Sequence, residues 1–157
     1  MITPYFQDEA VTIYHADCRE VLPLLEPVDL VLTDPPYGKV NRESSGLRVL
    51  DKGIADIETV APCEIVRLVA PLGQSFYVWC GTEQVSELRA GFVQAGLTTR
   101  LAIWEKTNPS PMNGQYLWLS ALESCVFARK EKAYFTRHCE APIWRGPSVD
   151  EPEHTTE

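Results

Sequence analysis

The chain has 157 residues, 45% of them hydrophobic and 23% charged, and a formal net charge of −8 at pH 7. These values are typical of one soluble globular domain with a real core. No apolar run is long enough to cross a membrane, so we expect a cytoplasmic protein without a membrane partner. The acidic balance argues against non-specific adhesion to nucleic acid. The five cysteines contain no Cys-x-x-Cys pair, which favours neither a disulfide framework nor a metal site.

Expected strands and helices alternate along the chain. In order, the sequence predicts a strand at 11–15, a helix at 18–25, a strand at 28–33, a helix at 59–70, a strand at 74–80, a helix at 83–95 and strands at 98–107 and 121–128. This alternation predicts an α/β fold with a mostly parallel sheet. The last two strands are too close in sequence for a helical crossover, so one of them is expected to be antiparallel. From residue 129 onward the pattern indicates loop and turn.

The apolar strand expected at 28–33 ends abruptly in Asp34-Pro35-Pro36-Tyr37. Proline cannot donate to a sheet ladder, so the chain must turn away at this point. Asp34 and Tyr37 therefore fall at the carboxyl end of a central strand, where open α/β sheets place their ligands. The alternative is an ordinary loop, because Asp, Pro and Gly are common turn residues.

Four segments resemble, in order, the amino-methyltransferases of DNA. The first is Asp34-Pro35-Pro36-Tyr37, similar to the catalytic motif (Asp/Asn/Ser)-Pro-Pro-(Tyr/Phe), whose aspartate form is usual in adenine-N6 enzymes. The other three lie at 67–79, 103–111 and 122–130. Their order resembles the permuted subclass, in which the catalytic half precedes the cofactor-binding half. The chain looks like the short solitary methyltransferases of actinobacteria and their phages.

This resemblance implies a Rossmann-like fold and methyl transfer from S-adenosylmethionine (SAM) to the N6 amine of adenine in double-stranded DNA. By resemblance, the Asp34 carboxylate and the Pro35 carbonyl accept the two amino hydrogens, and Pro36 helps to fix the direction of that carbonyl. Tyr37 stacks on a base flipped out of the helix. Asp34 also lies beside the cofactor.

The sequence allows both a functional and a structural role for several other residues. Asp17 resembles the family acid that contacts the cofactor, and the alternative is a helix N-cap. Candidates for DNA contact are Lys39, Arg42, Arg48, Lys52, Lys106 and Asn108, and the alternative is a solvated surface. Glu123 is expected to be a structural hydrogen-bonding residue rather than a catalyst. Three tryptophans are expected in the core: Trp79, Trp104 and Trp118.

Residues 1–130 are interpreted as the catalytic part, and 131–157 as a short target-recognition or linker segment. The family's glycine-rich cofactor loop has no counterpart, since the sequence contains no Gly-x-Gly. We therefore expect an incomplete sheet whose 28–33 strand has an open edge. A complementing C-terminal segment or a second copy of the chain would complete it.

Three alternative functions remain open from the sequence. The first is cytosine-N4 methylation of DNA, which uses a similar tetrapeptide. The second is protein-glutamine methylation, which the order of the segments disfavours because the glycine loop of those enzymes precedes the motif. The third is a non-catalytic remnant that binds DNA or a partner, a reading that the acidic composition favours.

Overall fold

The computed structural model describes residues 2–36, 60–111 and 114–148. Its centre is a five-stranded sheet with the spatial order β3 (Val28–Thr33), β4 (Gly73–Cys80), β6 (Leu122–Arg129), β5 (Thr98–Lys106) and β7 (Ile143–Gly146). The pairs β3–β4 and β5–β7 are parallel, whereas β6 is antiparallel to both of its neighbours. This confirms an α/β fold with a mostly parallel sheet and one antiparallel strand.

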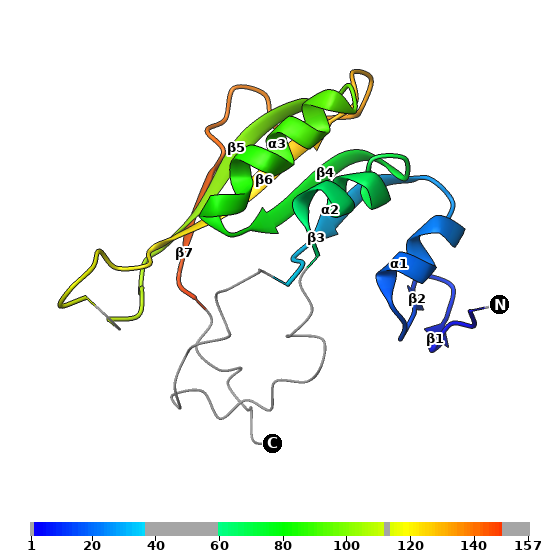
Figure 1. Cartoon of the computed structure of the whole chain (residues 1–157), viewed down its shortest axis with the longest axis horizontal. Helices are drawn as coiled ribbons and strands as arrows, with labels where there is room; N and C mark the ends of the chain where they lie inside the picture. The colour runs from blue at the N-terminus through cyan, green and yellow to red at the C-terminus, as the bar shows by residue number, and fades with distance from the viewer. Residues whose placement is uncertain (1, 37–59, 112–113, 149–157) are drawn as a thin grey trace.

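Two helices cover one face of this sheet, as Figure 1 shows. They are α2 (Pro62–Val69) and α3 (Val85–Gln94), and the short 3-10 helix η3 (Thr82–Gln84) precedes α3. Alternation along β4 points Phe76, Val78 and Cys80 toward the helices. Phe92 of α3 packs on Phe76, with 5.4 Å between the ring centroids. The core therefore lies between the helices and the middle of the sheet, which fixes the strand ends that carry the site.

The amino-terminal region forms a small unit outside the main sheet. The strands β1 (Phe6–Gln7) and β2 (Thr12–Ile13) pair with each other as an antiparallel hairpin. The helix expected at 18–25 is wrong in its second half, because it divides into α1 (Cys18–Val21) and the 3-10 helix η1 (Leu22–Leu24). Pro23 explains the division, since it has no N–H for a continuing α-helix.

The strand β7 contradicts the loop expected beyond residue 129. It pairs with β5 in register, Ile103 opposite Ile143 and Trp104 opposite Trp144. The indole Nε1 of Trp104 donates to the carbonyl oxygen of Gly146 at 3.2 Å. The four residues of β7 lie between two prolines and are too few to show alternation of polar and apolar side chains. The strand forms because it can pair with the edge of β5.

The expected open edge at 28–33 is present among the described residues, where β3 pairs only with β4. Val31 packs against the core, whereas Leu30 and Leu32 point to the opposite face and are 52% and 67% exposed. An uncovered apolar strand of this kind is a template for further pairing. Its completion by another segment or copy stays a prediction. In the described part of the chain, no helix is long and apolar enough to span a membrane.

Candidate functional site

Asp34 lies where β3 ends, at the carboxyl edge of the sheet. The last paired residue, Thr33, lies opposite Val78 of β4. Asp34 is exposed and Pro35 is partly buried, and both follow a strand that the core holds in place. The negative charge of Asp34 helps to raise the pKa values of the Cys80 and Cys125 thiols. Tyr37, the last residue of the motif, lies outside the described residues.

The thiols of Cys80 in β4 and Cys125 in β6 are buried. Burial raises the pKa of Cys80 to about 11, with smaller contributions from the carboxylates of Glu83 and Asp34. Burial likewise raises the pKa of Cys125 to about 12. Both thiols are therefore neutral at physiological pH, and they are poor nucleophiles and poor metal ligands in that state.

These pKa shifts predict selective alkylation. At pH 8 iodoacetamide should modify Cys18, Cys63 and Cys139, which are exposed, well before Cys80 and Cys125, and peptide mass spectrometry would locate the labels. Because the folded-state pKa values exceed the ordinary value of 9.0, the unfolded chain loses these protons first as pH rises. The free energy of unfolding should therefore fall above pH 9. Equal labelling of all five thiols under native conditions would contradict this arrangement.

Lys106 and Glu123 form an ion pair across β5 and β6. The Lys106 ammonium donates to Glu123 Oε1, and it also lies 5.6 Å from the centroid of the Trp104 ring. Their side chains are only 18% and 32% exposed. Glu123 is thus a structural hydrogen-bonding residue, as expected. A contact of Lys106 with DNA stays a prediction.

Asn108 joins the segments that follow β5 and β7. Its Oδ1 accepts from the backbone N–H of Ser148 at 2.7 Å and from the Ser148 hydroxyl at 3.0 Å. Its amide donates back to the Ser148 carbonyl at 3.3 Å. These bonds support a structural role at this edge, and the predicted DNA contact of Asn108 is untested. Four other expected DNA contacts lie outside the described residues: Lys39, Arg42, Arg48 and Lys52.

Asp17 is the N-cap of α1. Its Oδ1 accepts from the backbone N–H of Arg19 at 2.8 Å, and this bond lowers the pKa of the exposed Asp17 carboxyl. The Arg19 guanidinium also bonds Asp17 Oδ2 and Glu64 Oε1, each at 3.1 Å. The capping alternative is confirmed. Contact of Asp17 with a cofactor stays a prediction. The hairpin that precedes Asp17 is not part of the main sheet.

Aromatic rings cover part of the sheet face away from the helices. The Trp79 ring lies 6.5 Å from that of Trp104 and 5.8 Å from that of Trp144. Trp118 was wrongly expected in the core, since it is 99% exposed. It lies in the connection between β5 and β6, where no periodic pattern gives it a buried side. Sequence reasoning missed Trp144, and its only signal was the short apolar pair Ile143-Trp144.

The structure brings part of the predicted site together. Asp34 and Pro35 follow β3, and Lys106 and Asn108 lie at the end of β5, so all four occupy the carboxyl edge. The strands β4 and β6 separate the two groups. Asp17 belongs to the amino-terminal unit instead. The same edge thus carries the exposed Asp34 and partly buried Pro35 after β3, and, two strands away, residues at the end of β5 held by an ion pair and hydrogen bonds.

No protein-family model matches the chain. The Type II methyltransferase M2.LlaDCHI of Lactococcus lactis subsp. cremoris is 25% identical over 148 residues, which are 83% of this chain and 54% of that protein. The crystal structure of the M1.HpyAVI–SAM complex has a TM-score of 0.62 at 21% identity, covering 87% of this chain and 64% of that one. The structure of M1.HpyAVI alone gives a TM-score of 0.60 at 20% identity and covers 85% and 64%. The chain shares the fold of the M1.HpyAVI structures and spans between half and two thirds of the length of these relatives.

Proposed function

We propose that the chain is the catalytic part of a SAM-dependent DNA methyltransferase that acts on the N6 amine of adenine. The observation that carries the proposal is Asp34-Pro35-Pro36 at the carboxyl end of β3, in a sheet with the fold of the M1.HpyAVI–SAM complex. Similarity to the Type II methyltransferase M2.LlaDCHI supports DNA as the substrate. The carboxyl edge is where such folds bind their ligands.

The chemistry follows from the positions of the acceptors. The adenine amino group is a poor nucleophile because its lone pair is delocalised into the ring. The Asp34 carboxylate and the Pro35 carbonyl accept its two hydrogens, which localises the lone pair and directs it at the methyl group. Tyr37 stacks on the flipped base, whose extrusion costs a few kcal/mol. These residues accelerate the reaction by positioning, without a covalent intermediate.

The electrostatics of the edge suit the methyl donor. SAM, when bound, supplies a methyl group on a positively charged sulfonium. Burial and, to a smaller extent, the carboxylates of Glu83 and Asp34 raise the pKa of the Cys80 thiol. Negative charge of this kind favours a nearby cation. Asp34 would lie beside the bound SAM, and Asp17 is proposed to contact it from the amino-terminal unit.

Completion of the sheet belongs to the same proposal. The uncovered Leu30 and Leu32 and the partial coverage of the relatives support a complementing C-terminal segment, or a second copy, at β3. Calorimetry with SAM and sedimentation of the 157-residue chain would test this. SAM binding at micromolar affinity by a monodisperse monomer would exclude the need for a complement.

Transfer of labelled methyl groups from SAM to duplex DNA, in the presence of the complementing segment, tests the enzyme itself. Hydrolysis of the product and mass spectrometry of the nucleosides should yield N6-methyladenine. N4-methylcytosine would identify the cytosine-specific alternative. Absence of label in both bases would favour a non-catalytic DNA- or partner-binding chain, the reading that the net charge of −8 favours.

A further inference from the structure

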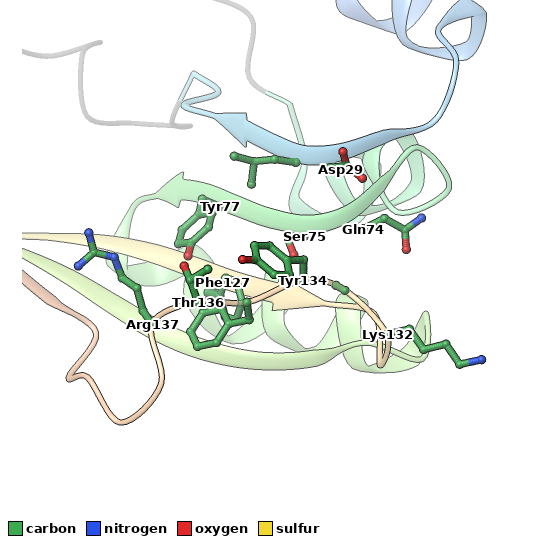
Figure 2. A pocket seen from close by; sticks show the side chains of 12 residues that line it. Asp29, Gln74, Ser75, Tyr77, Phe127, Lys132, Tyr134, Thr136 and Arg137 are labelled. Carbon is green, nitrogen blue, oxygen red and sulfur yellow. The ribbon is translucent and has the colours of Figure 1, made fainter.

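A concave site lies on the sheet face away from the helices, toward the edge opposite Asp34. It is a pocket of about 510 Å³ beside the beginnings of β3 and β4 and the end of β6. The far wall is formed by the turn that follows β6, residues 132–137. Figure 2 shows the rings of Tyr77, Phe127 and Tyr134 gathered in its middle, with Lys132 and Arg137 at opposite ends. The proposed methyl-transfer site does not use this pocket.

The turn that forms the wall is held firmly in place. The backbone N–H of Lys130 donates to the Gln74 carbonyl at 2.9 Å, which ties the start of the turn to β4. The Arg129 guanidinium donates to the carbonyls of Ala133 at 2.7 Å and Glu131 at 2.9 Å. Ala133 is buried, at 7% exposure. The pocket is therefore built by specific contacts and is not an incidental gap beside a loop.

The lining combines rings with charged and polar groups. The Tyr77 and Phe127 centroids are 4.9 Å apart, and Phe135 lies 5.7 Å from Phe127. Tyr134 lines the same pocket yet is 87% exposed, so one of its faces is available for stacking. Burial raises the pKa of the Tyr77 hydroxyl, and the charge of Arg137 partly offsets this rise. Arg137 lines the same pocket as the rings. Asp29 and Gln74 are also among the lining residues.

We propose that this pocket binds one unpaired nucleotide, with its base stacked on Tyr134 and its phosphate on Arg137 or Lys132. A planar base with an attached anion matches rings flanked by cations, as in sites for single-stranded nucleic acid. The volume lies in the range of ligand sites. A phosphate would compete with Glu140, whose carboxylate bonds Arg137 at 2.9 Å.

This ligand has two possible sources, a free nucleotide and an unpaired residue of a strand. Cations at both ends of the pocket suit a strand, whose phosphates continue on either side of the base. Fluorescence anisotropy with a labelled oligodeoxyadenylate of about eight nucleotides, competed by adenosine monophosphate, separates the two. A strand site binds the oligonucleotide at least about tenfold more tightly. Equal affinities per site assign the pocket to the free nucleotide.

Matched variants of the 157-residue chain test the pocket itself. Tyr134→Ala should weaken oligonucleotide binding about tenfold or more, and Tyr134→Phe should restore it. The control is Tyr116→Ala, since Tyr116 is 85% exposed but outside the pocket. Arg137→Ala should also weaken binding, whereas Arg67→Ala should not. Both arginine side chains are about equally exposed, at 70% and 71%, and each pairs with a glutamate three residues away.

Two results would overturn the inference. One is failure of the wild-type chain to bind either probe, and the other is equal loss in the pocket variants and their controls. The test is independent of methyl transfer, because it measures oligonucleotide binding in the absence of SAM. If the proposed enzymatic function fails while the Tyr134 and Arg137 effects remain, the nucleotide site stands alone.

Discussion

Asp34→Ala should reduce methyl transfer to DNA by about 100- to 1,000-fold, the usual loss when one preorganised polar group is removed from a reaction centre. The substitution deletes the carboxylate that accepts an amino hydrogen and leaves the nitrogen lone pair delocalised. Asp34→Asn keeps a carbonyl acceptor in the same position, so it should retain part of the activity. Transfer of labelled methyl groups, with the complementing segment present, measures all three proteins.

Folding controls separate this effect from damage to the fold. The circular dichroism spectrum and the Tm of Asp34→Ala, compared with those of the wild type, measure any change in the fold. Glu87→Ala provides a matched loss of one exposed carboxylate, in the first turn of α3, and it should keep full activity. Wild-type activity in Asp34→Ala would remove Asp34 from the reaction centre.

Phe92→Ala should lower the free energy of unfolding by about 3–5 kcal/mol. The Phe92 side chain is 0% exposed and its ring packs 5.4 Å from that of Phe76. Truncation leaves a cavity where α3 meets the sheet, and the loss is a large part of the stability of a small domain. Urea denaturation followed by tryptophan fluorescence would measure it.

The neighbouring residue offers a matched control for Phe92. Val93 belongs to the same helix but is 58% exposed, so Val93→Ala should change the free energy of unfolding by no more than about 0.5 kcal/mol. Similar losses in the two variants would mean that α3 does not present the Phe92 side to the sheet.

The regular elements were predictable wherever the sequence repeats a pattern over enough residues. The strand at 28–33 matches β3, and the amphipathic pattern at 83–95 matches η3 and α3, whose end is marked by Gly96 at φ 82°. The short elements were not predictable, because their formation depends on partners far away in the chain. β7 forms by pairing with β5, and Pro23 changes the helix type of η1.

The candidate site was likewise predictable only in part from the sequence. Asp34 could be placed from the sequence, because prolines must end the strand that precedes it. The Lys106–Glu123 pair depends on the register between β5 and β6, in which Trp104 lies opposite Glu123. The pocket beside residues 132–137 depends on Arg129, whose guanidinium holds the turn after β6 by donating to backbone carbonyls. Neither register nor a side-chain-to-backbone contact leaves a pattern in the sequence.

The uncovered face of β3 also affects how this chain behaves in concentrated solution. The backbone of β3 can pair with the same strand of another molecule, and the exposed side chains of Leu30 and Leu32 can pack against it. Such contacts are a route to aggregation. The net charge of −8 opposes such encounters by repulsion between molecules. Salt screens this repulsion but does not weaken apolar contact. The colloidal stability of the chain therefore depends on low ionic strength, and the charge that disfavours DNA binding also keeps β3 strands apart.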